Sequence, residues 1–205
     1  MLSELVDGFE TMTDLGPAVA VFGSARLDET SAMYAKARAF GARITEKGFA
    51  VVTGGGPGIM EAANRGAHEH NKPSCGISVD LPFETTSNPY IDRRFHMHFR
   101  YFFVRKVMLV RYAQAFVVFP GGFGSLDELF EALTLVQTHK IKAIPIYLVG
   151  TEYWKGLIDW LKERVLAEKM IEAKDLDLIQ LTDDVDGVAE HIAERYAKCS
   201  SFENF

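Results

Sequence analysis

Residues 120–128, Pro-Gly-Gly-Phe-Gly-Ser-Leu-Asp-Glu, directly follow the apolar run 115–119 and carry the clearest chemical signal in the chain. Where a buried strand leads through glycines into a helix, backbone N–H groups approach a ligand closely, and the helix N-terminus adds a partial positive charge. The pattern predicts an anion site with the candidate contacts Gly121, Gly122, Phe123, Gly124 and Ser125. Glu128 adds a carboxylate at its rim, which favours chemistry on a phosphorylated molecule over binding alone.

A second glycine-rich turn, Gly-Gly-Gly-Pro-Gly at residues 54–58, follows the apolar run 49–53. Its candidate ligand contacts are Gly54, Gly55, Gly56 and Gly58. Ser24 occupies the corresponding place after the first apolar run, residues 18–23. Pro57 suits the first position of a helix, because the N–H group of any residue there has no partner within the helix.

The second turn narrows the class of ligand. It lacks the Gly-Lys-Ser/Thr of a P-loop, and it does not match Gly-x-Gly-x-x-Gly followed by an acidic residue about 20 positions later. A dinucleotide is therefore disfavoured, and a mononucleotide fits better. The alternative is that these glycines only allow a strand and a helix to pack tightly, since a single glycine run is weak evidence.

Arg105 and Lys106 lie in the segment 101–112, whose apolar spacing predicts a helix. Residues three or four positions apart share a helix face, so Arg105 lies beside Phe102 and Met108. A guanidinium on an apolar face needs a polar partner, which a bound anion could supply. The alternative is that the stems of both cations pack while their charged groups extend to solvent.

Glu128 also has a structural interpretation. Ser125-x-x-Glu128 matches a capping box, in which Ser125 would be the N-cap and Glu128 would accept from its amide. A capping glutamate contributes about 1 kcal/mol to stability, whereas a catalytic one changes the rate by orders of magnitude. The pattern alone leaves both interpretations open.

We expect neither a metal nor a cofactor. His96 and His98 would point to the same side of a strand, but no third ligand at a known spacing accompanies them. Cys75 and Cys199 are far apart, so we expect free thiols in a reducing compartment, with Cys75 in the core. The aromatic side chains of residues 95–103 are assigned to the core or an interface, with the alternative that one of them stacks on a base.

Composition limits the class of protein further. The chain has 205 residues, 48% of them hydrophobic, which is enough for one domain with a real core. The net charge of −6 argues against a nucleic-acid surface, which normally needs a basic face. The sequence lacks an apolar run of membrane-spanning length, and residues 1–14 are acidic, unlike a signal peptide, so a cytoplasmic protein is expected.

Apolar runs alternate with amphipathic stretches along the chain, which predicts a single doubly wound, Rossmann-like α/β domain over residues 1–205 with a parallel sheet and helices on both faces. Strands are expected at residues 18–23, 49–53, 74–79, 115–119, 143–149 and 178–181. Helices are expected at residues 31–47, 58–70, 101–112, 125–139, 152–168 and 185–197. Residues 1–15 should add an N-terminal helix, residues 80–94 a long surface loop, and residues 198–205 a frayed tail.

The two glycine turns, Arg105-Lys106 and Glu128 together resemble the LONELY GUY (LOG) family of phosphoribohydrolases, whose members were long described as lysine decarboxylases. The resemblance covers residues 18–150 in motif order and spacing. The helix around Arg105 is similar to the longer bacterial branch of the family. Ser125 stands where the family motif usually has threonine, a change that keeps the hydroxyl.

The resemblance implies hydrolysis of the N-glycosidic bond of a nucleoside 5′-monophosphate, releasing the free base and ribose 5-phosphate. Cytokinin nucleotides are the best-known substrates, and AMP or another purine nucleotide is equally compatible with this sequence. The resemblance places the catalytic pair at Arg105 and Glu128, and the phosphate at Gly121, Gly122, Gly124 and Ser125. It assigns Lys106 a phosphate or ribose contact, and it implies a homodimer or larger homo-oligomer.

Two other functions compete with this hydrolase. The first is a carrier or sensor that binds a nucleotide or molybdenum cofactor without cutting it; such a protein would not need Arg105 together with Glu128. The second is literal lysine decarboxylation, which ordinarily needs pyridoxal phosphate on a Schiff-base lysine in a larger fold. No lysine of this sequence has that setting.

Overall fold

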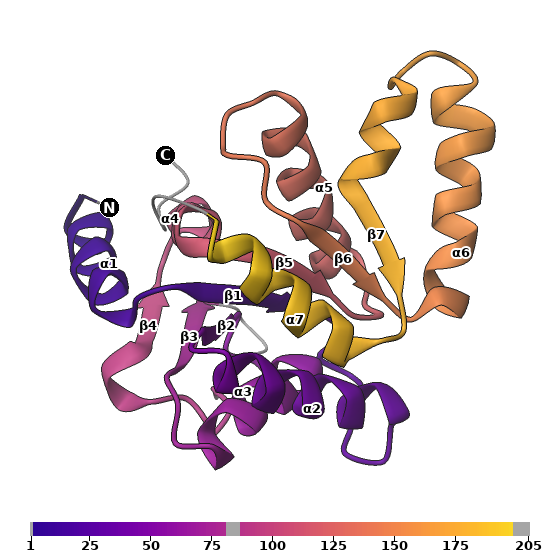
Figure 1. Ribbon diagram of the computed structural model, residues 1–205. Coiled ribbons are helices and arrows are strands. Elements are labelled where there is room, and N and C mark those ends of the chain that lie inside the picture. Colours follow the sequence, from indigo (N-terminus) through magenta and orange to yellow (C-terminus); the bar gives the residue numbers. More distant parts are fainter. Residues whose placement is uncertain (1, 81–86, 199–205) are drawn as a thin grey trace.

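A computed structural model describes residues 2–80 and 87–198. A seven-stranded, fully parallel sheet forms its centre, in the order β4-β3-β2-β1-β5-β6-β7. The strands are β1 Ala18–Phe22, β2 Ala50–Thr53, β3 Ser74–Val79, β4 His96–Phe99, β5 Ala113–Val118, β6 Ile146–Val149 and β7 Ile179–Thr182. The predicted doubly wound α/β fold is confirmed (Figure 1).

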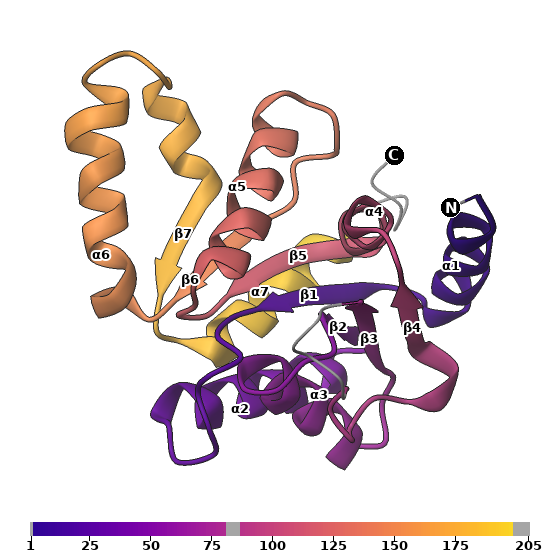
Figure 2. The same cartoon turned by 180° about the vertical axis from the view of Figure 1, so that it is seen from behind.

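Helices cover both faces of the sheet, as Figures 1 and 2 show from opposite sides. One layer consists of α2 Ala32–Glu46, α3 Ile59–Glu69 and α7 Val185–Tyr196. The other consists of α1 Leu2–Leu15, α4 Phe102–Tyr112, α5 Phe123–Gln137 and α6 Thr151–Trp160. Successive β1 side chains point to opposite layers, so every residue of the strand is buried.

The strand order reverses between β1 and β5. From β1 the chain builds β2, β3 and β4 outward on one side, and then returns to place β5 on the other side of β1. Two backbone hydrogen bonds hold the ends of these strands together, from the Phe119 amide to the Phe22 carbonyl (2.8 Å) and from the Ser24 amide to the Pro120 carbonyl (2.9 Å). Ligands of doubly wound folds bind beyond the carboxyl ends of the strands at such a reversal.

Several boundaries differ from the prediction. His96–Phe99 is an edge strand of the sheet, which the sequence pattern did not assign. The helix after the second glycine turn begins at Ile59 with Gly58 as N-cap, so Pro57 precedes the helix instead of opening it. The helix predicted at 152–168 is α6 followed by the π-helical turn Leu161–Leu166.

Part of the predicted 80–94 loop is anchored in the interior. Asn88 is only 7% exposed, and its side-chain amide donates to the carbonyls of Gly55 (3.2 Å) and Gly56 (3.1 Å). The 3₁₀ turn Arg93–Phe95 then leads into β4. Residues 81–86 of this loop and residues 199–205 of the predicted tail lie outside the described residues.

No helix within residues 2–80 and 87–198 combines the length and apolar character needed to cross a lipid bilayer.

Helices α2 and α3 approach each other so closely that their facing glycines leave no room for a side chain. A Cβ atom on Gly66 would lie 2.7 Å from the Ala42 amide nitrogen, and one on Gly41 would lie 3.1 Å from the Ala63 Cα. Backbone atoms cannot move aside as a flexible side chain can. This contact therefore sets the distance between α2 and α3 on their face of the sheet.

Gly66→Ala is expected to destabilise the fold by about 1–3 kcal/mol, because the added methyl group must push two helix backbones apart. Gly156→Ala in α6 is the matched control, since a Cβ there meets no atom within 4 Å. It should stabilise the protein by about 0.5–1 kcal/mol through helix propensity. Urea unfolding measures both variants, and equal shifts would contradict the close contact.

Candidate functional site

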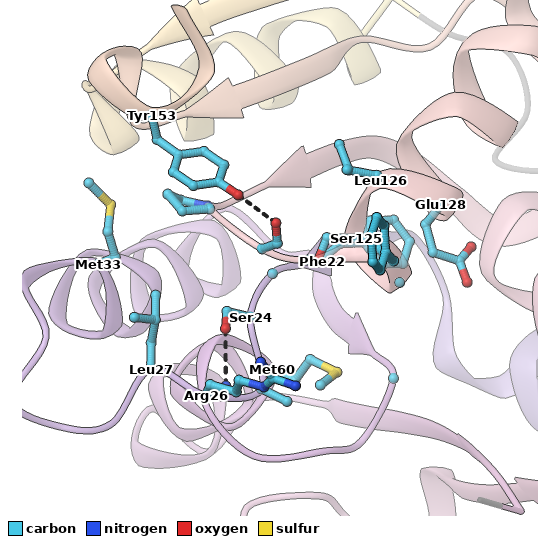
Figure 3. A pocket seen from close by; sticks show the side chains of 18 of the residues that line it. Phe22, Ser24, Arg26, Leu27, Met33, Met60, Ser125, Leu126, Glu128 and Tyr153 are labelled. Atoms are coloured by element: carbon cyan, nitrogen blue, oxygen red, sulfur yellow. Dashed lines mark hydrogen bonds between the residues drawn. The ribbon is translucent and has the colours of Figure 1, made fainter. Parts of the chain in front are cut away.

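A cavity of about 1220 Å³ opens at the strand-order reversal. Its walls come from the loops that follow β1, β5, β6 and β7, together with Gly54 at the end of β2 and Arg105 of α4. In Figure 3, Glu128 lies toward one end of the pocket and Met33 toward the other, with Ser24 and Ser125 between them. The structure thus brings the first glycine turn, Ser24, Gly54, Arg105 and Glu128 together at the place that the fold predicts.

The N-terminus of α5 is the part of this pocket that is suited to an anion. The helix begins at Phe123, so the amides of Phe123, Gly124 and Ser125 have no partner within the helix. A Cβ atom on Gly122 or Gly124 would meet no atom within 4 Å, which means that open space lies above both glycines. A phosphate can therefore approach these amides directly.

Gly121 is held from two sides. The Tyr153 hydroxyl donates a 2.6 Å hydrogen bond to its carbonyl (Figure 3), and a Cβ at this position would lie 3.0 Å from the Ser24 amide nitrogen. The turn is consequently fixed before any ligand arrives, and a preorganised anion site needs little rearrangement on binding.

The capping-box interpretation of Glu128 is wrong. The N-cap of α5 is Gly122, and Ser125 is the third residue inside the helix. Glu128 lies one turn further along and makes no capping bond. Its position therefore needs another explanation than helix initiation.

Glu128 is a buried carboxyl group, with 6% of the residue exposed. Burial raises the pKa of Glu128, and the positive charges of Arg105 and Lys106 only partly offset this effect. The neighbouring carboxylates of Glu131 and Asp127 raise it further. A carboxyl group with a raised pKa inside a pocket is suited to exchanging protons with a bound molecule.

Arg105 is half-buried at the same end of the pocket. Its guanidinium occupies the space above Gly54, where a Cβ atom would lie 2.6 Å from Nη2, and it lies 6.0 Å from the centre of the Phe102 ring. The Nε atom is buried without a hydrogen-bond partner among the described residues. A ligand that accepts hydrogen bonds would satisfy this group.

The structure places Lys106 outside the pocket that Arg105 lines. Lys106 does not line this cavity, and its amine pairs instead with Asp127 (2.9 Å) and Glu131 (2.7 Å). Successive residues on a helix point about 100° apart, which explains why Arg105 faces the pocket and Lys106 faces α5.

The second glycine turn supports the pocket more than it lines it. Of its four candidate glycines only Gly54 reaches the cavity. Gly55 and Gly58 have φ values of +79° and +71°, which favour glycine. A Cβ on Gly58 would also lie 2.8 Å from the Ala25 carbonyl carbon, so Gly55 and Gly58 shape the backbone. This agrees with the packing alternative for those two residues.

Sequence reasoning missed the pocket residues Arg26, Met60, Tyr153 and Asp183. Arg26 is an exposed cation two positions after Ser24, and its amide donates to the Ser24 hydroxyl (3.1 Å). Tyr153 and Asp183 follow β6 and β7. The rule that ligands bind at the carboxyl ends of strands could have identified them, had it been applied to every strand.

The histidines and Cys75 lie elsewhere. His96 Nε2 lies 2.7 Å from the Ser87 hydroxyl, and His98 pairs with Asp80. Cys75 is fully buried, and burial raises the pKa of its thiol. Phe95 and Phe99 are also buried, whereas Tyr101, Phe102 and Phe103 are exposed.

Glu128→Gln is expected to increase stability at neutral pH. Because the pKa of Glu128 is higher in the folded state, stability falls as the pH rises from the unfolded pKa of about 4.3 to the folded pKa, by about 1.4 kcal/mol for each pH unit between them. Glutamine does not ionise, so its burial causes no such loss of stability as the pH rises. Urea unfolding should show the gain at about pH 8 but not at about pH 4. Loss of stability at both pH values would contradict the desolvated carboxylate.

Comparison with known proteins identifies the family. A family model described as possible lysine decarboxylase matches residues 60–192. A protein of Oryza sativa subsp. japonica named cytokinin riboside 5′-monophosphate phosphoribohydrolase LOG is 33% identical over 102 residues, which span 47% of this chain and only 40% of that protein. The Arabidopsis thaliana protein of the same name numbered LOG3 is 25% identical over 187 residues, covering 88% of this chain and 83% of its own.

Solved structures show the same fold. The molybdenum cofactor carrier protein of Chlamydomonas reinhardtii matches with a TM-score of 0.64 at 22% identity, covering 89% of this chain and 99% of its own. The molybdenum cofactor binding protein of Rippkaea orientalis matches with a TM-score of 0.62 at 19% identity, covering 88% and 98%. These identities support a common fold alone. The family model covers well over half of the sequence, including Arg105 and Glu128, and the chain belongs to the LOG family that this model describes.

Proposed function

We propose that this protein hydrolyses the N-glycosidic bond of a purine nucleoside 5′-monophosphate, releasing the free base and ribose 5-phosphate. The observation that carries the proposal is the meeting of Arg105 from α4 and Glu128 from α5 in one pocket with the open N-terminus of α5. The relatives named as cytokinin riboside 5′-monophosphate phosphoribohydrolases support the same reaction.

The α5 N-terminus accounts for the phosphate. Its free amides and the Ser125 hydroxyl offer donors, and the helix dipole favours negative charge there. The protein has a net charge of −6, so its overall field would not attract a phosphate. The local donors must therefore supply the affinity, and a nucleoside without the phosphate should bind poorly.

Glu128 and Arg105 account for the bond cleavage. When the bond from the anomeric carbon to the base breaks, the sugar develops positive charge, which a nearby carboxylate stabilises. Water bonds to that carbon and gives a proton to Glu128, while the departing base nitrogen takes up a proton from solvent, to which Glu128 later returns its own. Arg105 orients the carboxylate and donates hydrogen bonds to the nucleotide, a task that suits a planar guanidinium better than an ammonium.

The apolar residues near Arg105 account for the base. Gly54, Met60, Val79 and Phe102 line the pocket on this side. A flat base can pack against such a wall, and aromatic rings favour stacked or edge contacts. AMP and its N6-prenyl derivative are the two substrates to compare.

The activity test measures free-base release from AMP, N6-isopentenyl-AMP and adenosine. Wild type should turn over the two nucleotides and leave adenosine nearly untouched. Glu128→Gln and Arg105→Ala should each lower kcat by about 10²–10⁴-fold, because proton transfer and charge stabilisation are lost. Glu194→Gln, an exposed glutamate of α7, is the matched control and should keep full activity.

A folded wild-type protein that binds these nucleotides and releases no base from either would contradict the hydrolase. The carrier function, which the fold of the molybdenum cofactor carriers makes the principal competitor, would then take its place. Thermal melts of every variant separate loss of turnover from loss of fold.

We further propose that the protein forms a homodimer through an aromatic face on α4 and α5. Its members are exposed aromatic side chains at the start of α4 and along α5, namely Tyr101, Phe102, Phe103, Phe123 and Phe130. Phe123 is 92% exposed, and an exposed cluster of large apolar groups commonly marks a protein interface. This face borders the pocket, since Phe102 and Phe123 also line it.

Light scattering should give about twice the chain mass for wild type. Phe130→Asp should shift the protein to the single-chain mass, because a charge would be buried in the interface. Leu2→Asp, an equally drastic change at an exposed position of α1, should leave the mass unchanged. A monomeric wild type would rule the interface out.

A further inference from the structure

Lys106 links α4 to α5 through two ion pairs. Its Nζ lies 2.9 Å from Asp127 Oδ2 and 2.7 Å from Glu131 Oε2. The lysine side chain is only 18% exposed, so solvent screens these pairs less than it screens an open surface pair. Burial opposes the charge on Lys106, but the hydrogen bonds to the two carboxylates raise its pKa, and the amine stays protonated.

Two of the three paired residues are sequence neighbours of Arg105 and Glu128. Lys106 directly follows Arg105, and Asp127 directly precedes Glu128. Asp127 and Glu131 are four positions apart and therefore share one face of α5, about one turn from each other. Both bonds converge on one Nζ atom, so they tie one face of α5 to a single point on α4.

Lys106 also balances the charge around Glu128. The charged groups that act on Glu128 are Arg105 and Lys106, which favour the carboxylate, and Glu131 and Asp127, which oppose it. By pairing with both acids, Lys106 offsets part of the negative charge that would otherwise repel a carboxylate at position 128. Without the lysine, Arg105 alone would offset the two negative charges near this buried carboxyl group.

We propose that Lys106 is a positioning residue, whose paired contacts to Asp127 and Glu131 hold α5 against α4 so that Arg105 and Glu128 face the same pocket. Lys106 does not line the pocket. The inference rests on the proposed hydrolase for its effect on rate, and on the geometry of the two helices for its effect on Glu128.

The kinetic test compares Lys106→Met with Lys106→Arg. Lys106→Met should lower kcat for AMP by about 10–100-fold and leave KM within about twofold, because misplaced reacting groups slow the chemistry while phosphate contacts persist. Lys106→Arg keeps the charge and should restore most of the rate. Lys155→Met is the matched control, since it also removes a lysine ion pair, with Asp159 (2.6 Å), on the exposed surface of α6.

A second readout does not depend on activity. Carbon-13 NMR titration of the Glu128 side-chain carboxyl, without nucleotide, should show a higher pKa in Lys106→Met than in wild type, and the acid limb of the kcat profile should move up with it. Glu131→Gln, which removes one partner and one repelling charge together, should lower the rate but should not raise this pKa.

Two results would overturn the inference. A raised KM for AMP with unchanged kcat would make Lys106 a substrate contact, as the family resemblance implies. An unshifted Glu128 titration in folded Lys106→Met would remove the electrostatic role, whether or not the wild type is active. An inactive wild type would refute the proposed hydrolase separately, because the titration can still be measured.

Discussion

The reversal of strand order between β1 and β5 is the constraint on which the rest of the structure depends. Side by side, these strands send their following segments in opposite directions, to α2 on one side and α5 on the other. The bonds from Phe119 to Phe22 and from Ser24 to Pro120 join the strand ends, and the pocket opens beyond them. This divergence produces the pocket and leaves the first amides of α5 at its edge. It also allows Arg105 of α4 to line the same pocket.

The site combines two demands that oppose each other. Excluding water from Glu128 makes its carboxylate a stronger proton acceptor, but it also penalises the charged form of the carboxyl group. Arg105 and Lys106 reduce that penalty from α4, one beside the pocket and one behind it. Arg105 and Lys106, which are neighbours on α4, thus stabilise the charged form of Glu128 from different sides.

Much of this could be predicted from the sequence, because the decisive signals were local. The apolar strand before Pro120 and the glycines after it predicted an anion site, and the family resemblance predicted that Arg105 and Glu128 share a site; the structure places both residues in one pocket. The direction of Lys106 could not be predicted, because it depends on where α5 lies. The strand His96–Phe99 was missed because an edge strand of four residues, with alternate positions exposed, gives a weak pattern.

The anchoring of Asn88 has a consequence for how such proteins diversify. The Asp80 amide is fixed to the Phe99 carbonyl (3.1 Å), and Asn88 is fixed to the turn that contains Gly55 and Gly56. The turn at Gly55 and Gly56 continues directly from Gly54, above which the Arg105 guanidinium lies. Asn88 itself does not line the pocket. Natural variation at position 88 can therefore change the pocket through the backbone of this turn, without replacing any residue that lines the cavity.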